Sequence, residues 1–212
     1  DGSIVQPGAF IPAAERYNLV NALDRWVIDA SFRYLRNTRS NGDDSIYSIN
    51  LSGSSLNDEE LPDYIQQKIG EHQVKTGQLC FEVTETAAVF NLENASLIIH
   101  SSKKLGCRFS LDDFGSGLSS FGYLKNLPVD FLKIDGSFVK DMNTDPMNRA
   151  IVEAIHQVGH TLSIRTIAEF VENKAIVDQL REIGVDFAQG YHFSKPEPLE
   201  KSDNVIKLHW KN

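Results

Sequence analysis

Cysteine, basic charge and long apolar runs are all scarce in this sequence, and each scarcity excludes a class of protein. Its two cysteines, Cys80 and Cys107, fit no metal-ligand spacing and lie in or beside apolar runs. We therefore expect buried free thiols. Lys and Arg number 21 against 29 Asp and Glu, a formal net charge of -8. This balance argues against a nucleic-acid polymer as partner, because a phosphate backbone requires a basic surface.

No run of about 18 apolar residues is present that could span a bilayer, and residues 1–12 lack the basic start and apolar block of a signal peptide. We expect no membrane insertion by this domain and a cytoplasmic location, which leaves room for a membrane anchor elsewhere in a parent protein. A content of 41% hydrophobic and 24% charged residues is typical of a globular domain. We place that domain at residues 1–200 and treat residues 201–212 as a C-terminal tail.

Helix and strand patterns alternate along the chain. Apolar residues recur at spacings of three and four between Leu19 and Leu35, which predicts an amphipathic helix. Short runs rich in β-forming residues then alternate with helical stretches, and this order predicts parallel strands joined by right-handed crossovers. The expected strands are 46–50, 79–83, 108–111, 131–134, 164–168 and 187–189, and the expected helices are 7–15, 59–74, 92–105, 119–125, 147–161 and 174–183.

Six strands are fewer than the eight of a closed (β/α) barrel. An open doubly wound sheet would also accommodate six. The chain, however, starts with a helix-forming segment, as if entered partway through a larger fold. We therefore favour an α/β fold of the TIM-like (β/α) barrel type, lacking its first strands, which we expect upstream of Asp1.

Each predicted strand carries a polar residue at or near its carboxyl end. In a parallel α/β fold these ends converge on one face, where ligands bind. Carboxylates gathered there would repel one another unless a cation is bound. Oxygen donors favour Mg²⁺ or Mn²⁺ over zinc, and two adjacent aspartates allow a bridged metal pair that can hydrolyse a phosphodiester. The residues are Asn50, Glu82, Glu85, Asp112, Asp113, Lys133, Glu169, Glu172 and Gln189.

Other interpretations of these residues have less support. Any one acid taken alone is better explained as a solvated loop residue, and only the whole set favours a site; Lys133 could equally neutralise Asp130 or Asp135. The glycine-containing loop 113–120 lacks the third glycine of a dinucleotide-binding fingerprint. His156 and His160 have the spacing of zinc ligands on a helix, but the zincin glutamate is absent, so we interpret them as surface or packing residues.

Six linked motifs resemble those of EAL domains in order and spacing, and the resemblance covers nearly the whole chain. The resemblance implies the fold of that family, a TIM-like barrel, and its activity, the hydrolysis of cyclic-di-GMP to linear pGpG. The family's Glu-Ala-Leu segment is absent from this sequence, and we expect it upstream of Asp1. The motifs are Asn50-Leu51-Ser52, Phe81-Glu82-Val83-Thr84-Glu85, the segment from Asp112 to Gly117, the segment from Pro128 to Asp135, Ala168-Glu169-Phe170-Val171-Glu172 and Gln189-Gly190-Tyr191.

The resemblance also implies a role for each site residue. Asn50, Glu82 and Asp112 would bind one Mg²⁺ or Mn²⁺ ion, and Asp112 would bridge to a second ion bound by Asp113 and Glu169. Lys133 would position the nucleophilic water. Glu85 and Glu172 would hold loop 113–120, and Gln189 would lie near the water or substrate.

Two positions depart from the family pattern, and two other functions remain open. Phe170 replaces a usual glycine, and Gly136 stands where arginine is frequent. The alternatives are a catalytically inactive cyclic-di-GMP receptor and an interaction module. A homodimer is the expected assembly, because EAL domains commonly pair through helices beside the site loop.

Overall fold

The computed structural model describes residues 5–37, 45–117 and 121–198. The expected tail at 201–212 lies outside these residues. The chain divides into two compact units, the first comprising Asp1–Val83 and Ala87–Arg108 and the second Thr84–Thr86 and Phe109–Asn212. None of the helices in the described residues has both the length and the apolar character needed to cross a membrane.

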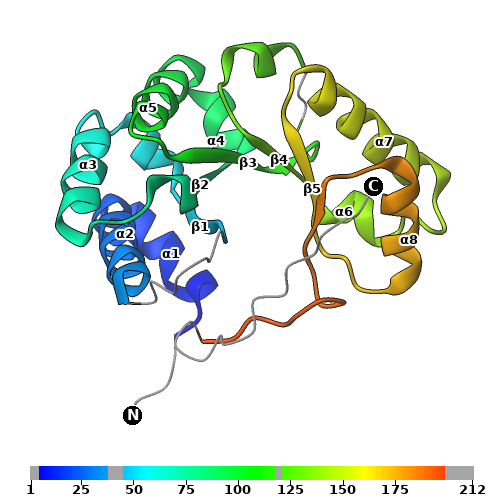
Figure 1. The fold of residues 1–212 in the computed structure, drawn as a ribbon, viewed down its shortest axis with the longest axis horizontal. Coiled ribbons are helices and arrows are strands. Elements are labelled where there is room, and N and C mark those ends of the chain that lie inside the picture. The colour runs from blue at the N-terminus through cyan, green and yellow to red at the C-terminus, as the bar shows by residue number, and fades with distance from the viewer. Residues whose placement is uncertain (1–4, 38–44, 118–120, 199–212) are drawn as a thin grey trace. The chain divides into compact units, whose positions relative to one another are not determined.

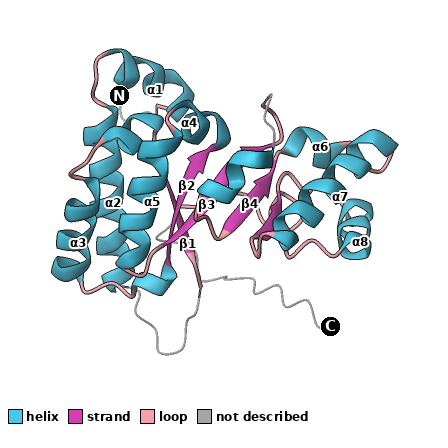
Figure 2. Cartoon of the chain, turned by 90° about the horizontal axis from the view of Figure 1, so that it is seen from above, coloured by secondary structure: helices cyan, strands magenta, loops and turns pink. Residues whose placement is uncertain are grey.

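The first unit is mainly helical. Figure 2 shows α2, α3 and α5 packed side by side, and their core includes the fully buried Phe32, Ile65 and Ile99. Its two strands pair in parallel, with Asn50 opposite Glu82. Its elements are α1 (Pro7–Arg16), α2 (Val20–Asn37), β1 (Tyr47–Asn50), the 3₁₀ helix η1 (Gly53–Asn57), α3 (Leu61–His72), η2 (Thr76–Gln78), β2 (Leu79–Thr84), α4 (Glu85–Phe90) and α5 (Leu92–Lys104).

The second unit contains a parallel run of four strands in the order β3, β4, β5, β6. In Figure 1, α7 and α8 lie on the same side of β5. Strand β4 is buried at all four positions, as expected for a strand covered on both faces. The elements are β3 (Arg108–Phe114), η3 (Phe121–Asn126), β4 (Phe131–Ile134), α6 (Gly136–Lys140), α7 (Pro146–Thr161), β5 (Arg165–Ala168), α8 (Lys174–Ile183) and β6 (Phe187–Ala188).

Local chemistry explains where the long helices of the second unit begin and end. The Asp145 side chain accepts a hydrogen bond from the Met147 amide at 2.8 Å, and Pro146 occupies the first turn of α7. Asn173 caps α8 in the same way. That helix ends at Gly184, whose φ of 92° is accessible to glycine without strain.

The expected elements are present, with several differences: β3 extends to Phe114 instead of ending at residue 111, and the 3₁₀ helices η1 and η2 were not expected. The helix expected at 119–125 is a 3₁₀ helix at Phe121–Asn126, and residues 118–120 lie outside the described part of the chain. Helices α4 and α6 were not expected, because five or six residues are too few to show a helical period. Cys80 and Cys107 are buried free thiols, as expected. Burial raises the pKa of Cys107 to about 12, so this thiol is unreactive.

Candidate metal and substrate site

Lys133 lies at the centre of a buried charge cluster in the second unit. Its Nζ atom is 2.9 Å from Asp112 Oδ1 and 2.9 Å from Glu169 Oε1. The three side chains come from β3, from β4 and from the residue that follows β5, three neighbouring strands of the parallel run. Lys133 is only 4% exposed, and a buried ammonium group requires such partners.

Asp113 joins this cluster through an irregularity in β3. The register between β3 and β4 shifts between Leu111 and Phe114, and Asp113 has a φ of 53°. Bulges of this kind re-aim side chains next to functional sites. As a result, carboxylate oxygens of Asp112, Asp113 and Glu169 lie within 4.8 Å of one another.

Burial and neighbouring carboxylates raise the pKa values of two carboxyl groups in this cluster. The pKa of Glu169 is raised to about 7, chiefly by burial; Lys133 opposes this rise and Asp112 contributes to it. Burial, followed by Asp112 and Asp135, also raises the pKa of Asp113. Closely spaced carboxylates with raised pKa values are stabilised in their charged form by a divalent cation. The donor chemistry therefore fits a hard metal ion.

Glu85 holds the start of the glycine-containing loop. Its carboxylate is 2% exposed and accepts hydrogen bonds from the Gly115 amide at 2.9 Å and from the Tyr123 hydroxyl. Gly115 has a φ of 98°, and a Cβ atom there would lie 3.0 Å from side-chain atoms of both Ile155 and Phe138. A glycine at this position is therefore required by both backbone and packing. No sequence signal marked Tyr123, whose contact with Glu85 arises only in the folded chain.

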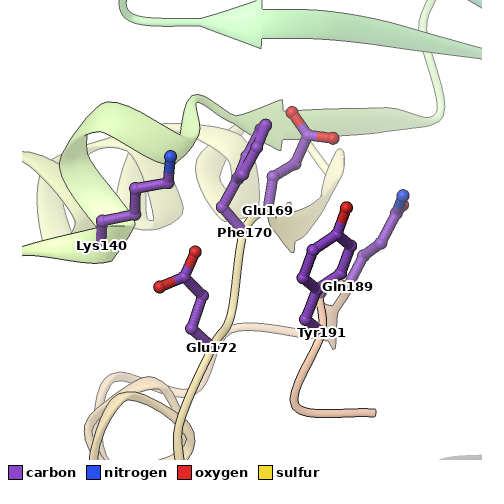
Figure 3. Close-up of a pocket in the computed structure, with 7 residues that line it drawn as sticks. Lys140, Glu169, Phe170, Glu172, Gln189 and Tyr191 are labelled. Carbon is purple, nitrogen blue, oxygen red and sulfur yellow. The ribbon is translucent and has the colours of Figure 1, made fainter. Parts of the chain in front are cut away.

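A pocket of about 320 Å³ opens beside Glu169 (Figure 3). Glu172 and Gln189 both line it. The Gln189 backbone is fixed by hydrogen bonds between its amide and the Ala168 carbonyl, 2.8 Å, and between its carbonyl and the Val171 amide, 3.0 Å. The lining residues are Lys140, Glu169, Phe170, Glu172, Gln189, Gly190 and Tyr191.

The two departures from the family pattern meet at one edge of this pocket. A Cβ atom on Gly136 would lie 2.1 Å from Phe170 Cδ2, so the phenyl ring occupies the space that a side chain at 136 would need. Lys140 Nζ lies 4.3 Å from the centroid of the same ring, a cation–π contact. Phe170 is half exposed and has a φ of 51°.

Asn50 and Glu82, the other two predicted ligands, belong to the first unit. They are paired in register, Asn50 at the end of β1 and Glu82 within β2, and the Leu51 amide donates to the Glu82 carbonyl at 2.8 Å. Glu82 is 5% exposed, whereas Asn50 is exposed. Their role as ligands of the same metal as Asp112 stays a prediction.

Comparison with known proteins establishes the family. The sequence profile described as EAL domain matches residues 1–196. This chain belongs to the EAL domain family. It is 43% identical over 198 residues to the cyclic di-GMP phosphodiesterase PdeB of Shewanella oneidensis, in an alignment covering 93% of this chain and 23% of PdeB.

A second relative and a solved structure extend this EAL assignment. The cyclic di-GMP phosphodiesterase PdeF of Escherichia coli is 33% identical over 204 residues, covering 96% of this chain and 27% of PdeF. The chain thus spans about a quarter of the length of these relatives. The PaMucR phosphodiesterase, solved in a c-di-GMP complex, superposes with a TM-score of 0.88 at 33% identity, covering 95% of this chain and 82% of that chain. The TIM-like α/β fold class is confirmed.

Proposed function

We propose that this EAL domain hydrolyses cyclic-di-GMP to linear pGpG with the help of Mg²⁺ or Mn²⁺. The observation that carries the proposal is the cluster of Asp112, Asp113 and Glu169 around Lys133. Two relatives are named cyclic di-GMP phosphodiesterases, and a solved relative contains c-di-GMP. Similarity to these proteins supports the same substrate here.

The carboxylates and the amide of Asn50 would bind the metal ions. Asn50, Glu82 and Asp112 would hold one cation, and Asp112, Asp113 and Glu169 would hold a second. When bound, such cations neutralise phosphate charge and supply an activated water. The all-oxygen donor set and the raised pKa values of Glu169 and Asp113 support this choice of ion.

Lys133 would act on the reacting groups directly. Its ammonium, held between Asp112 and Glu169, would orient a water or a phosphate oxygen. Glu85 would fix the loop through Gly115 and Tyr123, and we propose that Glu172 supports the same loop from the pocket side. Gln189, in the pocket wall, would contact the substrate or the water.

The test is pGpG formation by the parent protein that contains this domain. We expect turnover with Mg²⁺ or Mn²⁺ and none after chelation. The Asp112→Asn variant serves as the control because it keeps the shape of the side chain and removes its charge. Turnover no greater than that of the Asp112→Asn protein would refute the proposal. Tight, metal-independent binding of cyclic-di-GMP without turnover would instead identify a receptor.

We also propose a homodimer located in the cytoplasm. The proposal rests on the family's common pairing through helices beside the site loop, and on cyclic-di-GMP being a soluble second messenger. Light scattering of the parent protein over a range of concentrations tests the assembly. A mass that stays monomeric throughout would contradict it.

A further inference from the structure

A second group of potential metal ligands lies in the second unit, away from the carboxylate cluster. His156 and His160 stand one turn apart on α7, and Asp186 lies just before β6. The two imidazole rings are 4.4 Å apart between centroids, and ligand atoms of the three side chains lie within 4.8 Å of one another. Thr166, which contacts two of them, lies near the amino end of β5, whereas Glu169 follows the carboxyl end.

The hydrogen bonds of Thr166 fix the tautomer of His156. The Thr166 hydroxyl donates its only proton to Asp186 Oδ2 at 3.0 Å. Its contact with His156 Nδ1, at 2.8 Å, must therefore be one in which the imidazole donates. His156 then carries its proton on Nδ1 and keeps a free lone pair on Nε2. Histidines that bind metals are typically oriented in this way, by a hydrogen bond from the other ring nitrogen.

The carboxylate of Asp186 is oriented by the same strand. Its Oδ2 atom accepts from the Thr166 amide at 2.8 Å as well as from the hydroxyl, while Oδ1 lies 3.3 Å from His160 Nε2. One carboxylate oxygen is thus held by β5, and the other faces the histidines. Burial, followed by His160, lowers the pKa of His156, which keeps this imidazole neutral near pH 7.

A comparable group in the first unit shows why this arrangement matters. The ligand atoms of Asp29, Glu71 and His72 also lie within 4.8 Å of one another. Lys68 Nζ, however, lies 3.0 Å from Asp29 and 2.7 Å from Glu71, so an ammonium group already neutralises these carboxylates. Asp186 is instead paired with His160, a side chain that can itself become a ligand.

We propose that His156, His160 and Asp186 form a site for a divalent transition-metal ion, with Zn²⁺ as the preferred species. Two imidazole nitrogens and one carboxylate oxygen are a donor set that zinc accepts, and the exposed His160 leaves a fourth position open to solvent. The softer nitrogen donors distinguish this site from the all-oxygen cluster around Lys133. The bound ion would join α7 to the segment before β6, so it would stabilise the second unit by an amount that grows with the logarithm of its concentration once that concentration exceeds Kd.

Copper titration of the untagged chain, read by electron paramagnetic resonance, tests the site directly. Cu²⁺ bound by the two histidines would show hyperfine coupling to two nitrogens, which the carboxylate cluster has no means to produce. We expect both couplings in the unmodified chain and in Asp112→Asn. The His160→Gln variant should lose one coupling and bind Zn²⁺ at least about tenfold more weakly by calorimetry. His160 is 56% exposed on its side chain, so this change leaves folding intact.

Two further variants keep the outcome decisive. His192→Gln removes an exposed histidine outside the group and should change neither measurement. Thr166→Val removes the acceptor that orients His156 and should weaken Zn²⁺ binding without removing a ligand. An unmodified chain that shows fewer than two nitrogen couplings, or a His160→Gln protein that binds Zn²⁺ as well as the unmodified chain, would overturn the proposal.

Discussion

The close approach of Phe170 to Gly136 predicts how much a side chain at position 136 would destabilise the protein. A Cβ atom added at Gly136 would lie 2.1, 2.6 and 2.9 Å from Phe170 Cδ2, Cγ and Cβ. Rotation of the ring cannot relieve the last of these overlaps, because Phe170 Cβ is attached directly to the backbone. Gly136→Ala should therefore destabilise the protein by about 1–3 kcal/mol, the usual cost of overpacking.

Phe170→Gly should remove most of this cost. Glycine relieves the positive φ of residue 170, worth about 1 kcal/mol. The loss of the Lys140 cation–π contact, about 0.5–1 kcal/mol at an exposed ring, offsets this gain, so the single change is nearly neutral. In the double variant the alanine meets no ring, and it also improves the first turn of α6. The coupling energy between the two positions should thus be about 1–3 kcal/mol.

Urea unfolding of the four proteins in this double-mutant cycle measures that coupling. Gly70→Ala is the matched control, because a Cβ atom at Gly70 in α3 would meet nothing within 4 Å, and this change should not destabilise the protein. If Gly136→Ala costs as much in the Phe170→Gly background as in the unmodified chain, the steric reasoning is wrong. The cycle requires no activity and is therefore independent of the proposed function.

Three other predictions concern buried or paired charges. His72 is the main cause of the lowered pKa of Asp29, about 2, so the stability that Asp29 contributes is present above pH 4 and lost as the pH falls towards 2. Asp29→Asn should remove about 1 kcal/mol of stability at pH 7, after allowance for solvent screening, and almost none at pH 2 in acid-unfolding curves. Glu85→Ala should lower the free energy of unfolding by about 1–3 kcal/mol because the Gly115 amide loses its acceptor. Hydrogen exchange of that amide, measured by NMR, should become faster, and unchanged exchange would contradict this prediction. Lys133→Met should lower the free energy of unfolding by about 3–5 kcal/mol at pH 7, as measured by urea unfolding. The loss should be smaller at pH 5, because protonation there relieves the repulsion between the two carboxylate partners of Lys133. An equal loss at both pH values would argue against this reasoning.

The carboxylate cluster could be predicted from the sequence because it depends on topology alone. Once the strands are parallel, residues at their carboxyl ends must gather, and Asp112, Lys133 and Glu169 are such residues. The turn of the chain at Asp113 could not be predicted. Its φ of 53° and the register shift beside it depend on packing between β3 and its neighbour, which leaves no periodic signal.

Contacts between residues distant in sequence were likewise beyond prediction. The sequence shows that Phe170 and Gly136 are unusual, but only the fold shows that one fills the space left by the other. In the same way, the helical spacing of His156 and His160 is visible in the sequence. Asp186, which completes the group, is separated from them by β5 and α8 and carries no motif of its own.

The hydrogen bonds of Glu85 have a consequence for dividing the chain. The segment Thr84–Thr86 belongs to the second unit, although the residues on either side of it belong to the first. A protein cut near residue 108 would yield a C-terminal fragment without the acceptor for the Gly115 amide and the Tyr123 hydroxyl. The two units are therefore interleaved along the polypeptide, and a shuffling event or a split-protein design that exchanges the second unit must move Thr84–Thr86 together with residues 109–212.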